Sequence, residues 1–448
     1  MSRALKCSKV SEVKDQEQTD RISSLPDDLL GYMLSFLPTK SAVGTSILSS
    51  RWRYLHTLTN CLSFKTPLEF GQTKIKAQKK AFKKFVNRVL VLHKTSPIRK
   101  FSLDCGRYVF DDLDLHTWVS AAILKEVEQL HLSFIGQINA LPYRLFSCQT
   151  IVELKLSNIE RFRVPESIAL PNLKILHLYA MIFMDTDSFH KLVSACSLLE
   201  ELEVIRCKWP MDLDYHLRLS SRELKRLKIK CCEDQFQVDA PNLAYLEYYT
   251  IYADAALSLK NTDRLLTAIL EFPLIKDSIS NQLDVALIKA VCHVKELHLL
   301  GEALPYLTCL ADDQIPSYLN LVKLHLGRCS YNTWKYVTYW LANSPQLETL
   351  IFEKGVVSTR EDEWPPNVAL VSFSSRVKGI EVCHFRGFKT ELVLLKYLLG
   401  NAEVLQSLTL YKDYYNMSME EELQASNELL TLPRASRACV VHFRKFGA

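Results

Sequence analysis

Residues 173–178 read Leu-Lys-Ile-Leu-His-Leu, a six-residue frame with apolar side chains at its first, fourth and sixth positions. The same frame recurs at residues 127–132, 151–156, 199–204, 224–229, 243–248, 294–299, 321–326 and 347–352. Its fourth positions are separated by steps of 19 to 27 residues, except for one step of 51 residues between Leu246 and Leu297. That long step can hold two units, because Thr-Ala-Ile-Leu-Glu-Phe at 267–272 has the pattern of a degenerate strand.

A repeat of about 20–29 residues with this apolar spacing is typical of leucine-rich repeats. One unit cannot bury its apolar side alone, so stacked units share a continuous core. The sequence therefore predicts an α/β solenoid, an irregular leucine-rich-repeat horseshoe, over residues 101–360. Parallel strands should line its concave side, with helical or irregular segments such as 187–196 and 333–345 between them. The turn position of the consensus falls on Cys207, Cys232 and Cys329, which we expect to be buried.

The fifth position of each frame should point outward on the concave side, because side chains alternate along a strand. This stripe is the candidate target-binding face, although plain solvated polarity of a sheet is the alternative. His298 and His325 should be neighbours across two strands, but a metal site needs a third ligand that this stripe does not supply, so no metal is predicted. The stripe comprises His131, Lys155, His177, Glu203, Lys228, Glu247, His298 and His325.

The composition of the 448 residues, 48% hydrophobic and 23% charged, is that of an ordinary globular protein. No run of about 18 apolar residues and no secretory signal is present, which predicts no membrane association and a location in the cytoplasm or nucleus. The 13 cysteines are scattered without a CxxC pair, which argues against disulfides and zinc fingers. No glycine-rich phosphate loop, HExxH or GxSxG pattern occurs, so neither a cofactor nor a catalytic group is predicted.

Positive charge is concentrated between residues 71 and 100, which contain ten Lys or Arg residues and no Asp or Glu. Apolar residues such as Phe82, Val86 and Val89 recur there at helical spacing. We interpret residues 61–100 as a basic amphipathic connector that caps the N-terminal end of the solenoid. Nucleic-acid binding is the less favoured alternative, and would require affinity that falls steeply with salt.

Residues 20–55 contain start and stop signals that predict a set of short helices. Pro26 and the acidic pair that follows suit a helix start, and Pro38 ends that helix. About forty residues cannot bury this many apolar groups alone. The segment is therefore either a small core packed on the rest of the chain or a helical unit whose spare apolar face belongs to a partner.

Three motifs in this segment resemble the F-box of plant F-box/leucine-rich-repeat proteins: Asp-Arg-Ile-Ser-x-Leu-Pro-Asp at 20–27, Leu-Ser-Phe-Leu-Pro-Thr-Lys at 34–40 and Ser-x-Arg-Trp at 49–52. The resemblance implies an all-α F-box at residues 20–60, preceded by a disordered tail at 1–19. It also implies docking on the Skp-type adaptor of a cullin-scaffolded ubiquitin ligase. The residues at or supporting that interface would be Leu25, Pro26, Leu29, Leu34, Leu37, Pro38, Val43, Leu48, Arg51 and Trp52.

The frame persists in weakened form after residue 360, at 377–382 and 405–410. Helices are expected at 391–399 and around 420–430, and a strand at 438–443. Residues 391–405 and 432–439 resemble the FBD domain that ends many of these plant proteins. The resemblance implies an α+β FBD domain over residues 361–448, which can cap the last apolar face of the solenoid.

Taken with the resemblance, the sequence predicts a non-catalytic substrate-recognition subunit of a Skp–cullin–F-box ligase, with an unknown target protein held by the repeats. The alternative is a repeat scaffold with weak or no ligase assembly. Its one hint is His56, which stands where the family usually carries a second Trp.

Overall fold

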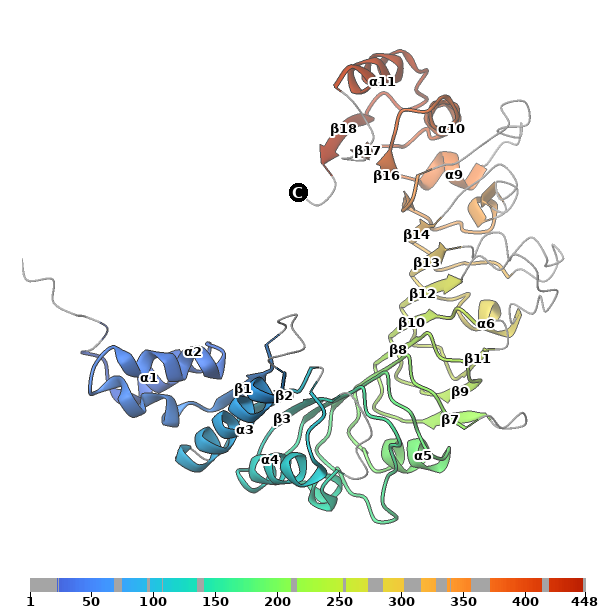
Figure 1. Cartoon of the computed structure of the whole chain (residues 1–448). Helices are drawn as coiled ribbons and strands as arrows, with labels where there is room; N and C mark the ends of the chain where they lie inside the picture. The colour runs from blue at the N-terminus through green and yellow to red at the C-terminus, as the bar shows by residue number, and fades with distance from the viewer. Residues whose placement is uncertain are drawn as a thin grey trace, which may run out of the picture.

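The chain forms an open arc in the computed structural model, with small helical units at both ends (Figure 1). The proposed tail at 1–19 and Cys329 lie outside the described residues. The structure describes residues 22, 24–67, 75–94, 97–106, 108–134, 141–210, 216–252, 255–272, 285–301, 316–327, 337–338, 340–355, 371–412 and 419–445.

Short helices build the N-terminal helical unit (residues 22–60). Helices α1 (Asp27–Leu34) and α2 (Thr39–Gly44) are followed by 3-10 turns η1 (Thr45–Ile47) and η2 (Trp52–Leu58). Each α-helix begins directly after a proline, which is compatible with a helix start because its missing N–H is not needed there. The unit has a core of its own, separate from that of the solenoid, made of Leu30, Leu34, Ala42, Trp52 and Leu55.

A single parallel sheet of fifteen strands runs from residue 61 to residue 445, which confirms the predicted solenoid. Every predicted frame contributes a strand, including the degenerate one at 267–272. The strands are, in spatial order, β1 (Cys61–Lys65), β2 (Lys100–Asp104), β3 (Gln129–Ser133), β4 (Glu153–Ser157), β5 (Ile175–Tyr179), β6 (Glu201–Ile205), β8 (Arg226–Lys230), β10 (Tyr245–Tyr249), β12 (Thr267–Phe272), β13 (Glu296–Gly301), β14 (Lys323–Leu326), β15 (Thr349–Phe352), β16 (Gly379–Phe385), β17 (Ser407–Lys412) and β18 (Val440–Lys445).

The repeat frame sets both the register and the core. Fourth-position leucines pair directly across neighbouring strands, as Leu154 does with Leu176 and Leu176 with Leu202, and all three are fully buried. Cys207 and Cys232 are buried in the turns as expected. The Cys207 thiol donates a 3.5 Å hydrogen bond to the carbonyl oxygen of Leu178 in the preceding unit. Burial raises the pKa of the Cys207 thiol to about 12, so it behaves as a packing group.

The convex wall changes character along the arc. It begins with helices α3 (Ile75–Leu92) and α4 (Asp112–Leu124), the turn η4 (Tyr143–Ser147) and helix α5 (Asp187–Ser194). A second parallel sheet of β7 (Leu217–Ser220), β9 (Phe236–Asp239) and β11 (Leu257–Lys260) then replaces the helices, before α6 (Val285–Ala290). This second sheet was not predicted from the sequence.

The first and last segments belong to the same sheet. Strand β1 pairs with β2 at the N-terminal end, so residues 61–100 contribute β1, helix α3 and the first residue of β2 to the solenoid. At the other end, α9 (Val371–Arg376), α10 (Lys389–Asn401) and α11 (Met419–Thr431) alternate with β16, β17 and β18. Within the described part of the chain, none of the helices has the length and apolar character needed to cross a bilayer.

Candidate functional site

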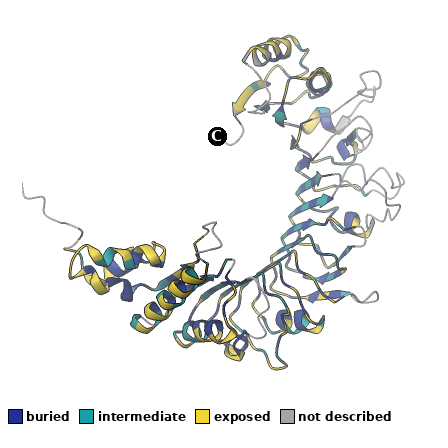
Figure 2. Cartoon of the chain, viewed as in Figure 1, coloured by how far each residue is buried: buried dark blue, intermediate teal, exposed yellow. Residues whose placement is uncertain are grey.

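The N-terminal helical unit leaves apolar side chains uncovered, although its own core is closed (Figure 2). Leu37 is 41% exposed and Leu48 is 64% exposed. Sequence reasoning did not single out Phe36 and Ile47, which are 71% and 88% exposed. The available signal was that apolar residues occupy both sides of these helices, more than one buried stripe requires. We call the set Leu29, Phe36, Leu37, Ile47 and Leu48 the exposed apolar face.

The ten predicted adaptor residues divide into three groups. Exposed positions hold Pro26, Leu29, Leu37, Pro38, Leu48 and Arg51. Leu34 and Trp52 are buried in the core of the unit, and half-buried Leu25 packs against that core. Val43 points the other way and packs against the core of the solenoid.

Arg51 links the second half of the N-terminal helical unit to its beginning. Its guanidinium donates hydrogen bonds of 2.7 and 3.0 Å to the Asp27 carboxylate and a further one to the carbonyl oxygen of Leu25. These contacts tie the residue before η2 to the start of α1, 24 residues earlier. Arg51 therefore shapes the surface that carries the exposed apolar face.

His56 is buried between the N-terminal helical unit and the solenoid. Its pKa is lowered by burial and by the nearby charge of Arg88 on α3. His56 therefore belongs to the joint between the two units, and the substitution of the usual Trp falls on that joint.

Hydrogen bonds make this joint continuous with the sheet. The Thr39 hydroxyl accepts a 2.7 Å bond from the backbone N–H of Ser63 on β1. The ring Nε2 of His93, just after α3, donates a 2.7 Å bond to the carbonyl of Thr59. The backbone N–H of Lys94 donates to the carbonyl of Thr57 at 3.1 Å. The N-terminal helical unit is thus held in one orientation at the end of the arc (Figure 1).

Helix α3 carries the basic segment. Its apolar stripe, Phe82, Val86 and Val89, is buried in the solenoid core. The Lys83 ammonium lies 2.6 Å from the Asp114 carboxylate on α4. The helix is therefore packed on the solenoid with other lysines, such as Lys80, in water, as the favoured interpretation expected.

The predicted stripe lies on the concave side of the sheet, where seven of its eight residues are half-buried and His325 is buried. In its N-terminal part, Glu153 binds two stripe residues: its carboxylate lies 2.8 Å from His131 Nε2 and 2.8 Å from Lys155 Nζ. Burial pushes the pKa of Glu153 up, but the hydrogen bonds from Lys155 and His131 outweigh it, and the pKa lies below its usual value. Burial lowers the pKa of His131.

The middle of the stripe is a chain of alternating charges. The Lys228 ammonium lies 2.8 Å from Glu203 and 3.8 Å from Glu247, and Lys230 also pairs with Glu247. The hydrogen bond to Glu203 raises the pKa of Lys228. Through Glu203, which is also 3.5 Å from His177 Nδ1, the chain reaches β5. These side chains satisfy one another without a ligand.

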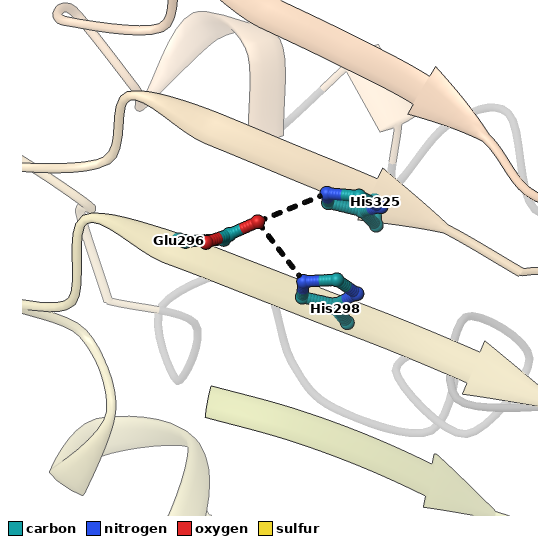
Figure 3. A group of neighbouring side chains, drawn as sticks. All are labelled: Glu296, His298 and His325. Atoms are coloured by element: carbon teal, nitrogen blue, oxygen red, sulfur yellow. Dashed lines mark hydrogen bonds and ion pairs between the residues drawn. The ribbon is translucent and has the colours of Figure 1, made fainter. Parts of the chain in front are cut away.

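A separate cluster forms at His298 and His325, which are register partners on β13 and β14 as predicted. Their rings stack with centroids 3.6 Å apart and an interplanar angle of 13°. Glu296 reaches both rings from the third position of the same frame (Figure 3). The third donor that the stripe alone lacks is thus present. Burial, and secondarily the charge of His325, lower the pKa of His298 to about 4.

The stripe was predicted from the sequence, but the residues that pair with it were not. Glu153, Glu201 and Glu296 occupy third positions of the frame, and Lys230 and Glu353 follow sixth positions. Their side chains lie on the same side of the strand as the fifth positions. Counting two residues back and two residues forward from each fifth position would therefore have identified them.

Comparisons with known proteins agree with this architecture. A family model described as the F-box domain matches residues 22–55. A second, described as the leucine-rich repeats of FBD-associated F-box protein At5g56370, matches residues 115–299.

Curated relatives from Arabidopsis thaliana match most of the chain. F-box/LRR-repeat protein At3g59190 is 34% identical over 372 residues, covering 77% of this chain and 95% of the relative. F-box/LRR-repeat protein At4g14096 is 31% identical over 454 residues, covering 94% of each. Putative F-box/LRR-repeat protein At3g58880 is 32% identical, covering 88% of this chain and 92% of the relative. The chain therefore belongs to the F-box/leucine-rich-repeat family of plants, with its F-box in the N-terminal helical unit.

Proposed function

We propose that this protein is the substrate-recognition subunit of a Skp–cullin–F-box ubiquitin ligase. The F-box would bind a Skp-type adaptor, and through it a cullin scaffold, while the concave face holds an unknown target protein. The chain would act as a receptor without chemistry of its own, in the cytoplasm or nucleus.

The observation that carries the proposal is the exposed apolar face of the F-box. Apolar side chains gathered on one small unit are costly in water and commonly mark a protein-binding surface. The F-box core does not need them, since Leu30, Leu34 and Trp52 already close it. A second protein is the natural cover for Leu37 and Leu48.

The rigid joint supports the same role. A receptor accelerates ubiquitin transfer by holding target lysines near the charged enzyme, which raises their effective concentration. That advantage is greatest when the arm cannot swing freely. The hydrogen bonds from Ser63 and His93 to the F-box, together with the continuous sheet, make such an arm.

Adaptor binding is tested by co-purifying the full chain with a Skp-type adaptor. Leu37→Asp combined with Leu48→Asp should abolish co-purification, because two carboxylates would be buried unpaired at the interface. Unfolding of the full chain should be unchanged. Val91→Asp on α3 is the matched control, since Val91 is 83% exposed but lies outside the F-box. Full adaptor binding by the double variant would refute the proposal.

Leu25→Ala combined with Pro26→Ala is a second, milder variant, which we also expect to lose the adaptor while the repeats stay folded. Nucleic acid is not proposed as a partner, and affinity that falls steeply as salt rises would be the sign of such binding. The alternative of a scaffold with weak ligase assembly rested on His56. Because His56 is buried in the joint and not on the outer surface of the F-box, it does not favour that alternative.

A further inference from the structure

Two imidazole rings and a carboxylate meet on the concave face, on the adjacent strands β13 and β14 (Figure 3). Glu296 Oε1 lies 3.2 Å from Nε2 of His298 and 3.2 Å from Nε2 of His325. The three donor atoms all lie within 4.8 Å of one another. Backbone pairing places the two histidines directly opposite, so the sheet itself holds the group together.

His325 is the informative member, because it is more than nine-tenths buried. Its Nδ1 lies 2.6 Å from the Glu353 carboxylate. A carboxylate only accepts, so Nδ1 carries the proton and, in the neutral ring, Nε2 carries a lone pair. Among the described residues this buried Nε2 has no hydrogen-bond partner. The lone pair therefore faces the oxygen of Glu296, an arrangement that a cation between them would stabilise.

We propose that Glu296, His298 and His325 form a binding site for a zinc ion on the concave face. Two imidazole nitrogens and one carboxylate oxygen are a donor set that suits Zn²⁺. With bonds of about 2.0–2.1 Å, adjacent donors of a tetrahedral zinc site lie about 3.3–3.4 Å apart. The two 3.2 Å separations are close to that value. Three protein ligands leave the fourth position to water or to a donor from a bound protein.

The surroundings provide a second shell. Glu353 holds the Nδ1 proton of His325, the carboxylate–histidine arrangement that orients metal-bound imidazoles. Lys323 would compete with the zinc ion for Glu296, because its ammonium lies 3.2 Å from Glu296 Oε1. Its side chain is 40% exposed and can turn into solvent when the ion arrives. The stacked rings must also splay at their Nε2 ends, and His298 must move its proton to Nδ1.

The comparable group at His177, Glu201 and Glu203 lacks these features. It has one imidazole, and both ring nitrogens already face carboxylates, at 2.7 and 3.5 Å. Its two carboxylates are bound by cations, Arg226 at 3.5 Å from Glu201 and Lys228 at 2.8 Å from Glu203. It therefore serves as the matched control for the zinc site.

Zinc binding is tested on the full chain after treatment with a chelator. We expect competition between protein and a chromophoric chelator for added ZnCl₂ to show one equivalent bound. X-ray absorption at the zinc edge should show two imidazoles in the first shell. His298→Ala and His325→Ala should each weaken binding at least 100-fold, whereas His177→Ala should leave it unchanged.

Two further variants keep the test decisive if a histidine variant unfolds. Glu353→Gln should weaken zinc binding by about 10-fold, through loss of the orienting carboxylate. Lys323→Met should tighten it, because the ammonium no longer competes for Glu296. The proposal fails if wild-type protein binds no zinc, if His177→Ala loses zinc as His298→Ala does, or if Lys323→Met binds no more tightly than wild type.

Discussion

The F-box and the concave sheet present opposite kinds of surface. The F-box exposes apolar side chains such as Leu37, Ile47 and Leu48, which none of the described residues covers. The concave face is half-buried and polar, and its charges pair with one another, as Lys228 does with Glu203. An uncovered apolar face favours a long-lived complex, since it remains costly in water until a partner buries it. A self-paired polar face favours selectivity, because a target must replace contacts that already exist.

The two regions also differ in how they are stabilised. The F-box has a small core of five buried residues, whereas the solenoid core runs unbroken from β1 to the last helices. A small core depends on each of its members. The F-box should therefore be the part of the chain that a single substitution can unfold without the rest.

The largest expected effect is that of Trp52→Ala. Removing this buried ring should cost about 3–5 kcal/mol, because it leaves a cavity that the small F-box core cannot fill. Hydrogen exchange should show loss of protection within residues 24–60 and retention in strands β3 to β6. Equal loss of protection across both regions would mean that the F-box and the solenoid unfold as one unit. Leu48→Asp is the control and should change unfolding by less than about 0.5 kcal/mol.

A smaller effect is expected at the joint as the pH falls. Burial lowers the pKa of His93, the Thr59 hydrogen bond opposes this, and the charges of Lys125 and His56 lower it further. The folded pKa therefore lies below the unfolded value of about 6.5. His93 contributes stability above pH 6.5 that is lost as the pH falls through the folded pKa.

Urea unfolding at pH 7.5 and pH 5.0 measures this dependence. His93→Gln should flatten it, because Gln takes up no proton. His116→Gln, at an exposed position on α4, is the control and should keep the wild-type slope. An unchanged slope in His93→Gln would place the pH sensitivity of the joint elsewhere.

The smallest effect is expected on the concave face. Glu203→Ala removes contacts to His177 and Lys228, both partly open to water. Ion pairs that keep contact with water contribute little, so the free energy of unfolding should change by at most about 1 kcal/mol. Target binding, once a target is identified, should change far more than stability does. A loss of several kcal/mol would show that these charges hold the sheet together rather than serve recognition.

Much of this architecture could be predicted from local pattern. The six-residue frame located twelve of the fifteen strands of the main sheet, including the weak ones at 267–272 and 377–382, and β18 was predicted separately as a strand at 438–443. The two that escaped, β1 and β2, lie on either side of the basic helix. Thr59 stands at the first position of the frame at β1, and Phe101 replaces Leu at the fourth position of the frame at β2. The second sheet also escaped, because β7, β9 and β11 have only four residues each. A four-residue strand carries too little periodicity to be distinguished from a loop.

The sequence by itself determined which residues face inward. Apolar residues at the fourth and sixth positions make one side of each strand apolar, while the first position lies just before the strand, and the stacking of units then follows from burial. The tertiary structure decided which residues meet. It turned Val43 and His56 toward the solenoid and left Phe36 and Ile47 outside. It also brought Glu296 to both histidines, because this contact depends on side-chain rotamers, which a local sequence pattern does not specify.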